Sequence, residues 1–440
     1  MTKKKIIIIG AGLAGLSAAW HLQKRGIDCL IFEKESEVGG LCRSKQVNGF
    51  TFDYDGHLLH FRNPYTFGLI KSLLGNNLVA HKRQALVHSF NRYIRYPFQA
   101  NLYGLPPEVN RECLLGIIET CRARGSRHSE KNRNFLEWIN QTFGKGIAKH
   151  FMVPYNLKFW TVPPQELICD WLNNFIPVPS LIQVLEGAVA ESKREVGYNA
   201  CFWYPKKGGI NQVPLALAKQ IRNINLNCPV VEIDLKKKLI RVGSGSTYKF
   251  DVLINTIALP EMPRLIKGLP GGIQSSFEKL RWNSIFNLNL GVSKKDHLRR
   301  HWVYFPEKDI SFFRIGFPHN FSSSLVKKNH SSLYVEVSYS KAQALDKRKI
   351  SLRIERDLKK VGILSSTDKV VERDINDIKY GYPIYDHAYQ SARGKIMEFF
   401  KKHKIIACGR YGAWQYMSME DAILDGQRVA EKLKQNKVTA

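Results

Sequence analysis

The chain has 440 residues, of which 44% are hydrophobic and 24% charged. These values exclude a disordered or fibrous protein, and the length favours two or three lobes around a large buried interior. The 67 Lys and Arg against 38 Asp and Glu give a formal net charge of +29, which favours an anionic partner. Because no nucleic-acid-binding module or zinc-ligand spacing accompanies this charge, we expect no nucleic-acid binding.

The N-terminus combines features of a signal peptide and of a nucleotide-binding unit. Lysines at 3–5 precede an apolar run to Trp20, as in a secretory leader. However, Ile6–Ile9 is a short β-branched strand, and the glycines after it lead into a helix-compatible run to Arg25, with Gly26 as its stop. We therefore predict a strand, a glycine turn and a helix in a cytoplasmic protein without a transmembrane segment. The basic charge leaves peripheral membrane contact open.

A dinucleotide-binding fingerprint follows the first predicted strand. Gly10, Gly12 and Gly15 have G-x-G-x-x-G spacing, and a second predicted strand, Cys29–Phe32, ends at Glu33, about twenty residues further on. The first glycine permits a tight turn, the second lets backbone approach the pyrophosphate, and the third allows close packing of helix and strand. The helix N-terminus would face the phosphates and Glu33 the ribose hydroxyls.

A second glycine pair, Gly39 and Gly40, follows that carboxylate and lets the chain pass close to a cofactor. This arrangement resembles the large FAD family that includes amine oxidases, protoporphyrinogen oxidase, carotenoid desaturases and UDP-galactopyranose mutase. The end of the chain agrees, because 405–410 predicts a strand into a glycine turn and Asp421–Lys434 predicts a helix. The FAD-binding residues expected from the fingerprint and the resemblance together are Gly10, Gly12, Gly15, Glu33, Gly39, Gly40, Arg43, Ser44, Gly56, Val231, Thr256, Gly409 and Asp421.

Two further segments, 228–233 and 251–256, resemble strands that return to the FAD domain near the adenine. The resemblance therefore implies an α/β fold whose Rossmann-type FAD-binding domain is discontinuous, with inserted segments that carry the substrate. The expected parts are a FAD domain of 1–66, 193–284 and 395–440, a mostly helical substrate- and uridine-binding lobe of 67–192, and an antiparallel sheet lobe of 285–394.

Five separate stretches resemble UDP-galactopyranose mutases, and the eukaryotic type more than the common bacterial one. In the first, residues 49–57, the mutases have a D-x-G-G-H loop whose histidine lies beside the flavin. His57 holds that place here, while Asp55 replaces a glycine. A lone histidine is more often structural, so only the motif makes His57 a candidate catalytic residue.

The second and third stretches align with residues that contact uridine in the mutases. Tyr96 and Gln99 belong to a Y-P-F-Q-x-N segment, and Phe151, Asn156 and Trp160 align with the uracil pocket. A flat base needs an aromatic face to stack on and an amide that both donates and accepts at its edge. Without the family match, this aromatic cluster would be interpreted as core packing.

The fourth and fifth stretches align with the diphosphate and sugar end. Asn199 falls on a mutase loop that carries an asparagine toward the substrate, and Arg314 and Arg410 fall on the arginines that grip the diphosphate. Arginine suits this task because its planar fork binds phosphate oxygens bidentately and stays charged. The aromatic residues of the fifth stretch that we expect at the substrate are Trp302, Tyr304, Tyr382 and Tyr416.

Two departures from the mutase pattern concern the sugar end. Phe175, after two asparagines at 173–174, takes the place of an arginine in the mobile substrate loop of the eukaryotic-type mutases. The asparagine that follows the last tyrosine of the mutases is missing from 417–421. Both changes lie near flavin or sugar rather than near uridine, so the resemblance implies the nucleotide UDP and leaves the hexose open to differ from galactose.

The resemblance implies a redox-neutral isomerase that interconverts pyranose and furanose forms of UDP-galactose or a related UDP-sugar, for cell-surface glycans. FAD, kept reduced by NAD(P)H or another reductant, would attack the anomeric carbon through N5. Arg314 and Arg410 would neutralise the departing diphosphate, and His57 would set the protonation or conformation of the flavin. The alternative is an FAD-dependent oxidoreductase of amine oxidase or desaturase type, which would have an apolar tunnel and little need of paired arginines. A third hypothesis, ranked below these two and suggested only by the basic charge, is a non-catalytic or membrane-bound flavoprotein.

Cysteine usage gives no sign of a metal site or a disulfide framework. The eight cysteines are scattered, without C-x-x-C pairs or histidines at ligand spacing. We expect them to be reduced core residues, which agrees with a cytoplasmic enzyme. They are Cys29, Cys42, Cys113, Cys121, Cys169, Cys201, Cys228 and Cys408.

Overall fold

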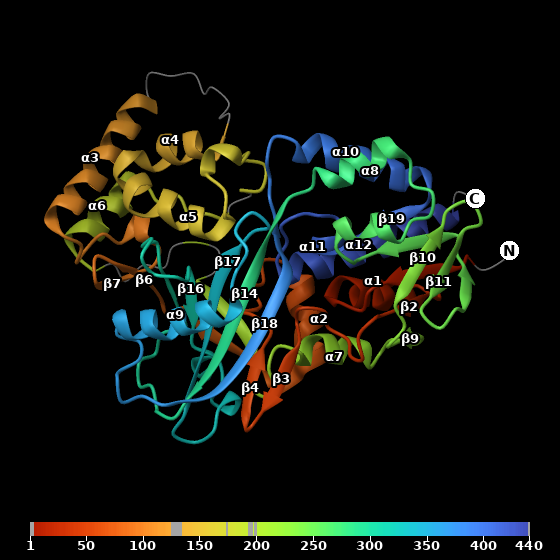
Figure 1. Cartoon of the computed structure of the whole chain (residues 1–440), viewed down its shortest axis with the longest axis horizontal. Helices are drawn as coiled ribbons and strands as arrows, with labels where there is room; N and C mark the ends of the chain where they lie inside the picture. Colours follow the sequence, from red (N-terminus) through yellow and green to blue (C-terminus); the bar gives the residue numbers. More distant parts are fainter. Residues whose placement is uncertain (1–3, 125–133, 173–174, 192–196, 198–199, 439–440) are drawn as a thin grey trace.

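The computed structural model describes residues 4–124, 134–172, 175–191, 197 and 200–438. Figure 1 shows three parts: a group of helices at the left, long strands in the middle, and a smaller sheet covered by helices at the right. The polypeptide crosses between these parts several times. The prediction of a discontinuous α/β fold is therefore confirmed.

The smaller sheet is parallel and carries the predicted fingerprint. Its strand order is β19-β13-β1-β2-β9, and each neighbouring pair is parallel. All four residues of β1 are buried, as in a strand covered on both faces. Because parallel neighbours need crossover connections, the segments inserted between these strands leave the sheet and return to it. The strands are β1 Ile6–Ile9, β2 Leu30–Phe32, β9 Ile224–Asn225, β13 Val252–Asn255 and β19 Ile405–Ala407.

Helices α1 (Leu13–Gln23) and α12 (Met419–Val438) pack against each other beside this sheet (Figure 1). Their approach is close enough that a Cβ at Gly426 would lie 2.6 Å from the backbone nitrogen of Ala18. The first and last helices of the chain are therefore held together by a contact that only glycine permits. The other helices in this part of the molecule are α7 Gln212–Ala218, α8 Gly271–Glu278, α10 Tyr389–Lys402 and α11 Gly409–Gly412.

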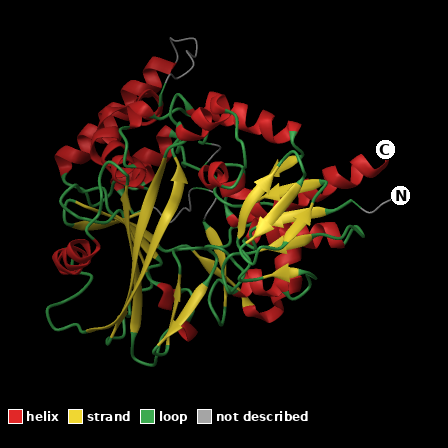
Figure 2. Ribbon diagram, turned by 45° about the vertical axis from the view of Figure 1, so that its right-hand side comes forward, coloured by secondary structure: helices red, strands yellow, loops and turns green. Residues whose placement is uncertain are grey.

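The central sheet has the order β18-β14-β17-β16-β15-β6-β7. Figure 2 shows its long strands crossing the molecule between the helical lobe and the parallel sheet. Its pairs are antiparallel except β15 with β6, which is parallel. The strands are β6 Ala85–Ser89, β7 Arg92–Arg95, β14 Trp282–Val292, β15 Trp302–Tyr304, β16 Arg314–Gly316, β17 Ser331–Tyr339 and β18 Val370–Pro383; helix α9 Lys347–Lys360 lies between the last two in sequence.

Strands β6 and β7 lie in the segment 67–192, which we expected to be mostly helical. The two residues between them, Phe90 and Asn91, both have positive φ, 53° and 57°, as in a tight hairpin turn. Residues 85–95 therefore form a hairpin that joins the central sheet at its edge. The sequence lacks the Asn-Gly or Asp-Gly signal that would have marked this turn.

The helical lobe contains α3 (Pro107–Arg124), α4 (Phe135–Ile147), α5 (Val153–Trp160) and α6 (Leu181–Val189), and α2 (Pro64–Leu74) precedes it in sequence. Helices α3 and α4 approach closely, since a Cβ at Gly146 would lie 2.2 Å from the carbonyl oxygen of Glu112. A π-helical turn, Ala148–Met152, joins α4 to α5. Such turns re-aim side chains and are frequent at functional sites.

The segment 228–233, which we expected to return to the FAD domain, begins a separate sheet of β10 (Val230–Asp234), β11 (Leu239–Val242) and β12 (Thr247–Lys249). The strand that pairs with β2 at the edge of the parallel sheet is β9, which is only two residues long and carried no clear strand signal. Two smaller pairs are β3 Ser44–Val47 with β4 Phe50–Asp53 and β5 Leu78–Lys82 with β8 Cys201–Pro205. Short 3-10 turns occupy Gly75–Asn77, Phe98–Ala100, Pro164–Glu166, Leu259–Arg264, Pro318–Asn320 and Ser323–Leu325.

All eight cysteines are free. The expectation that they are core residues is wrong for Cys201, which is exposed at the start of β8. Within the described ranges, no helix is long and apolar enough to span a bilayer. The same ranges contain no cluster of three or more His, Cys, Asp or Glu that could hold a metal ion.

Candidate functional site

Two adjoining cavities lie where the three parts of the chain meet. The larger, about 660 Å³, follows the predicted glycine loops, and we call it the glycine-loop cavity. The smaller, about 270 Å³, lies between the helical lobe and the central sheet, and we call it the arginine cavity. His57 and Arg410 line both, so the two cavities meet at these side chains.

The glycine-loop cavity is shaped by backbone. Gly12 and Gly39 form an isolated parallel bridge, and a Cβ at Gly40 would lie 3.2 Å from the Cα of Gly12. Side chains at these positions would fill the cradle. Of the predicted cofactor-binding residues, those that line this cavity are Gly10, Gly12, Glu33, Gly39, Gly40, Arg43, Thr256 and Gly409.

Glu33 lies buried at the edge of this cavity. One carboxylate oxygen accepts a hydrogen bond of 2.7 Å from the backbone nitrogen of Ala11, and the other accepts one of 3.0 Å from Glu35. Helix α1 begins at the same cavity with Gly12 as its N-cap and no side-chain cap. A glycine cradle, a helix N-terminus and a fixed carboxylate together match the chemistry of a dinucleotide, so these residues fit FAD.

Several predicted cofactor-binding residues do not line the glycine-loop cavity. A Cβ at Gly15 would lie 2.1 Å from the carbonyl oxygen of Gly10, so this glycine supports the loop from behind. The Ser44 hydroxyl donates to Asp53 at 2.6 Å. Asp421 accepts from Arg62 at 2.6 Å. Val231 is exposed on the separate sheet, and Gly56 lines the arginine cavity instead.

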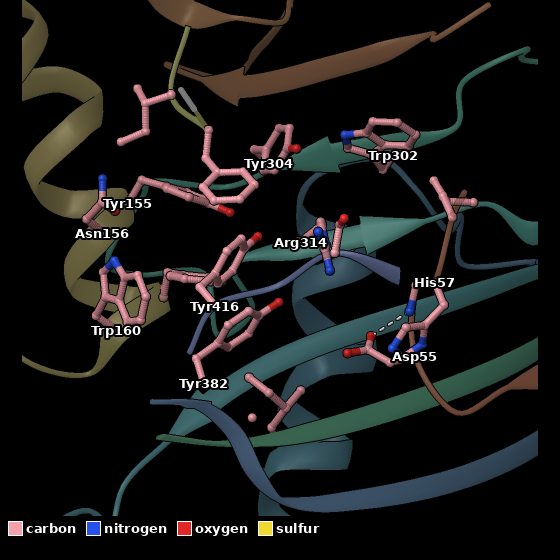
Figure 3. A pocket seen from close by; sticks show the side chains of 18 of the residues that line it. Asp55, His57, Tyr155, Asn156, Trp160, Trp302, Tyr304, Arg314, Tyr382 and Tyr416 are labelled. Atoms are coloured by element: carbon pink, nitrogen blue, oxygen red, sulfur yellow. Dashed lines mark hydrogen bonds between the residues drawn. The ribbon is translucent and has the colours of Figure 1, made fainter. Parts of the chain in front are cut away.

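The arginine cavity brings together nearly all the residues that the mutase motifs singled out, although they come from distant segments (Figure 3). Asn199 falls outside the residues that the structure describes. The other predicted catalytic and substrate-binding residues all line the cavity: His57, Tyr96, Gln99, Phe151, Asn156, Trp160, Trp302, Tyr304, Arg314, Tyr382, Arg410 and Tyr416.

One end of this cavity is aromatic and carries unpaired polar atoms. The ring of Phe151 stacks between Phe98 and Tyr155, with centroids 5.0 and 5.3 Å away. The indole nitrogen of Trp160 and the side-chain oxygen of Gln99 are buried without a hydrogen-bond partner among the described residues. A buried donor or acceptor left unsatisfied costs about 1–3 kcal/mol, so this end of the cavity offers one donor and one acceptor to a polar partner.

The middle of the cavity holds a cation between tyrosines. The guanidinium of Arg410 lies 5.2 Å from the ring of Tyr382 and 4.9 Å from that of Tyr416, and its Nε donates to the carbonyl of Met417 at 2.8 Å. The two tyrosine rings stack with centroids 5.7 Å apart. Burial raises the pKa of the Tyr382 hydroxyl, so it is a neutral hydrogen-bond donor beside the arginine.

Arg314 differs from the expectation of an arginine free to grip phosphate. It lies opposite Glu336 on the neighbouring strand β17 and forms a bidentate ion pair with it, in which Nη2 donates to Oε1 at 2.6 Å. Glu336 is fully buried. Two of the guanidinium nitrogens are therefore already engaged by a carboxylate.

His57 lies at the junction of the cavities. Its side chain is half-buried, its Nδ1 is buried without a hydrogen-bond partner among the described residues, and its backbone nitrogen donates to the carbonyl of Asp55 at 2.8 Å. Burial is the largest cause that lowers the pKa of His57, so the imidazole is neutral at neutral pH. Figure 3 shows His57, Asp55 and Arg314 on the same side of the cavity.

Sequence reasoning missed several residues of this site. Tyr155, Tyr334 and Trp171 line the cavity, and Glu336 lies directly behind Arg314. The signal for Glu336 was a single acid inside the apolar run of β17, which is costly unless the acid is paired. Phe175, the departure from the mutase pattern, packs edge-on against Tyr416 with ring centroids 4.6 Å apart.

A family model for flavin-containing amine oxidoreductases matches residues 13–434. The chain belongs to this family. Among solved structures it is similar to a reduced UDP-galactopyranose mutase, with a TM-score of 0.93 and 27% identity, covering 99% of this chain and 95% of that one. It is also similar in fold to a putative protoporphyrinogen oxidase from Exiguobacterium sp. 255-15, with a TM-score of 0.75 and 15% identity over 99% of this chain and the whole of the other.

Two curated relatives match more than half of the chain at lower identity. The chain is 23% identical over 274 residues to a probable flavin-containing monoamine oxidase A of Dictyostelium discoideum, and 24% identical over 293 residues to a 4,4'-diapolycopene oxygenase of Methylomonas sp. These matches cover 58% and 60% of this chain, and the chain spans only 57% and 58% of the lengths of the two relatives. Family membership and the glycine cradle support FAD as the cofactor, and the predicted resemblance to UDP-galactopyranose mutases within this family is confirmed.

Proposed function

We propose that this flavoprotein is a redox-neutral UDP-sugar mutase that interconverts pyranose and furanose forms, with UDP-galactose or a related UDP-sugar as substrate. The observation that carries the proposal is the arginine cavity, where the mutase motifs of distant segments meet next to the glycine-loop cavity. The similarity to a reduced UDP-galactopyranose mutase supports it. The free cysteines are compatible with the reducing cytoplasm, where we place the enzyme.

In this proposal the glycine-loop cavity holds FAD through Gly12, Gly39, Gly40 and Glu33. Reduced FAD, maintained by NAD(P)H or another reductant, supplies the nucleophile for the anomeric carbon. His57 stands where the cavities meet and is neutral, so it offers a hydrogen-bonding nitrogen without adding a charge.

The arginine cavity binds and orients the nucleotide. The aromatic end stacks the uracil, and the unpaired atoms of Trp160 and Gln99 supply one donor and one acceptor for its edge. Arg410, with the hydroxyls of Tyr382 and Tyr416, faces the diphosphate and stabilises its charge as the bond to the sugar breaks. Burial excludes water from this end, so the diphosphate stays close for the return step.

The test is an anaerobic assay of the purified flavoprotein reduced with dithionite. UDP-galactopyranose or UDP-galactofuranose is added, and interconversion is followed by chromatography. Turnover in the reduced state, its absence in the oxidised state and its loss in Arg410→Ala would support the mutase. Tight UDP binding without interconversion would support UDP as the nucleotide of the substrate, and other UDP-sugars would then be tested in the same assay.

The second candidate is an FAD-dependent oxidoreductase, favoured by the oxidase and oxygenase names of the curated relatives. Such an enzyme would transfer hydride from its substrate to FAD and would consume no nucleotide sugar. Two arginines and at least four tyrosines in the substrate cavity fit an apolar substrate poorly. If the anaerobic assay showed no UDP binding and no interconversion, the oxidoreductase would be the better account.

A further inference from the structure

Lys158 is a half-buried residue of helix α5 that bonds to the central sheet, and the proposed function assigns it no role. It does not line the arginine cavity. Its ammonium group donates to three backbone carbonyls, those of Phe305 at 2.8 Å, Glu307 at 2.9 Å and Phe312 at 2.5 Å. An ammonium group has three N–H donors and no acceptor, so these three bonds use its full hydrogen-bonding capacity.

The three carbonyls belong to one turn, residues 305–313, which joins β15 to β16. Tyr304, the last residue of β15, and Arg314, the first residue of β16, both line the arginine cavity. The backbone nitrogen of Phe305 donates to the carbonyl of Phe313 at 2.9 Å, so the pairing of the two strands continues into the turn. A shift of the turn would therefore displace both cavity-lining side chains.

Helix α5 forms the facing wall of the cavity. Asn156 and Trp160, on either side of Lys158 in sequence, line the cavity, and Figure 3 shows them on the helix that faces the strands of Tyr304 and Arg314. The helix also touches the turn through aromatic rings, with the centroids of Phe159 and Phe313 5.3 Å apart. Hydrogen bonds are more directional than such ring contacts, so the ammonium of Lys158 fixes the position of the turn along the helix.

The charged form of Lys158 is the one that satisfies all three carbonyls. Desolvation is the largest cause that lowers the pKa of Lys158 to about 7, and the carboxylates of Glu307, Asp309 and Asp357 raise it. The neutral amine would have two donors for three acceptors. The ammonium form therefore predominates at about pH 6, which is the pH chosen for the titrations.

We propose that Lys158 is a positioning residue that holds the α5 wall and the β15–β16 wall of the arginine cavity at a fixed separation. A ligand that contacts both walls gains affinity from its second end only when this separation matches its length, as for any two linked binding groups. The inference rests on the proposed function for the identity of that ligand, which is UDP with its uracil against α5 and its diphosphate toward Tyr304 and Arg314. Lys158 acts on the diphosphate end through the turn, without touching the ligand.

The experiment is calorimetric titration of the oxidised holoenzyme with UDP, and with uridine in competition with UDP. The ratio of the two dissociation constants, uridine over UDP, measures the affinity that the diphosphate adds. Lys158→Met keeps the apolar stem and removes all three donors. We expect UDP to bind this variant about tenfold more weakly and uridine to bind within about twofold of the parent, so that the ratio falls at least about fivefold. A ratio that matches that of the parent, whether both affinities fall or neither does, would overturn the inference.

Three further variants sharpen the test. Lys158→Gln keeps two donors without the charge and takes the place of Lys158→Met if that protein does not fold, and its ratio should fall about threefold. Ile139→Val is the stability control, because it removes a methyl group from a buried residue of α4 that does not line the cavity. Lys149→Met removes an exposed lysine paired with Glu112. Both controls should keep the ratio of the parent. An unchanged ratio in Lys158→Gln, or an equal fall in Ile139→Val, would overturn the inference.

A second measurement needs no ligand and separates this inference from the proposed function. Amide hydrogen exchange, followed by mass spectrometry of peptides, reports how often the turn 305–313 opens. We expect exchange in this turn to be at least about tenfold faster in Lys158→Met than in the parent, and unchanged in Lys149→Met. Equal exchange in Lys158→Met and the parent would overturn the inference. Faster exchange in Lys158→Met, together with a parent that binds neither uridine nor UDP, would support the role of Lys158 in holding the turn and would count against the mutase alone.

Discussion

The glycine-loop cavity and the arginine cavity adjoin each other but are built from different parts of the polypeptide. The first is shaped mostly by backbone, at positions where a Cβ would meet another backbone atom. The second is shaped by side chains from the loop of His57, the helical lobe and the central sheet. A backbone cavity depends on a few glycines and tolerates few substitutions at them. A side-chain cavity depends on pairs of groups, and its chemistry changes when one partner is replaced.

The largest effect is expected where a substitution displaces the glycine loop that shapes the backbone cavity. A Cβ at Gly15 would lie 2.1 Å from the carbonyl oxygen of Gly10, so Gly15→Ala should displace the loop, destabilise the protein by about 3 kcal/mol and abolish flavin binding. Flavin absorbance per protein and thermal unfolding would measure both effects. Gly68→Ala, at an exposed helical glycine with open space, is the control and should retain flavin with a small gain in stability. A Gly15→Ala protein that retains its full complement of flavin would contradict the idea that the backbone cavity depends on its glycines.

The side-chain cavity should fail in a different way, by losing turnover while keeping flavin. Arg410→Ala removes the cation between Tyr382 and Tyr416, and we expect interconversion to fall roughly 10²- to 10³-fold. The flavin spectrum should be little changed in amplitude. Arg281→Ala, which removes a half-exposed arginine paired with Glu166, should leave the rate within about twofold of the parent. Equal losses of interconversion rate in Arg410→Ala and Arg281→Ala would mean that Arg410 affects turnover only through protein stability.

A smaller effect is expected at the aromatic end. Trp160→Phe keeps most of the aromatic surface but removes the unpaired indole nitrogen, so UDP should bind about 1 kcal/mol more weakly, roughly fivefold in Kd. Trp414→Phe is a matched control, because its indole nitrogen is also buried and unpaired among the described residues but does not line the arginine cavity. Equal UDP affinity in the parent and Trp160→Phe would remove this nitrogen from the binding site.

The same contrast explains what the sequence could and could not predict. The glycine-loop cavity follows from local spacing, and strand β1 has the predicted bounds, because a tight turn, a helix and a carboxylate are adjacent in the chain. The residues of the arginine cavity were found through motif resemblance, since no spacing links Tyr96 to Tyr416. The pairing of Arg314 with Glu336 was missed because it depends on the register of β16 with β17. A residue type predicts a charge, but only the fold decides which neighbour compensates it.

The last prediction concerns the pH dependence of stability. The folded-state pKa of Glu336, about 8, lies above its usual value, so the folded protein holds a proton that the unfolded chain releases. Stability from this proton is complete below about pH 4.5 and declines as the pH rises toward about 8, by at most about 1.4 kcal/mol per pH unit. Histidines such as His60 and His301, whose pKa values desolvation lowers to about 4, act with the opposite sign, because their folded forms bind protons less tightly than the unfolded chain. The difference between the unfolding curves of the parent and of Glu336→Gln, measured in urea between about pH 5 and pH 8, cancels the histidine contribution and should shrink with rising pH. A difference that stays constant would mean that Glu336 is ionised in the folded protein throughout this range.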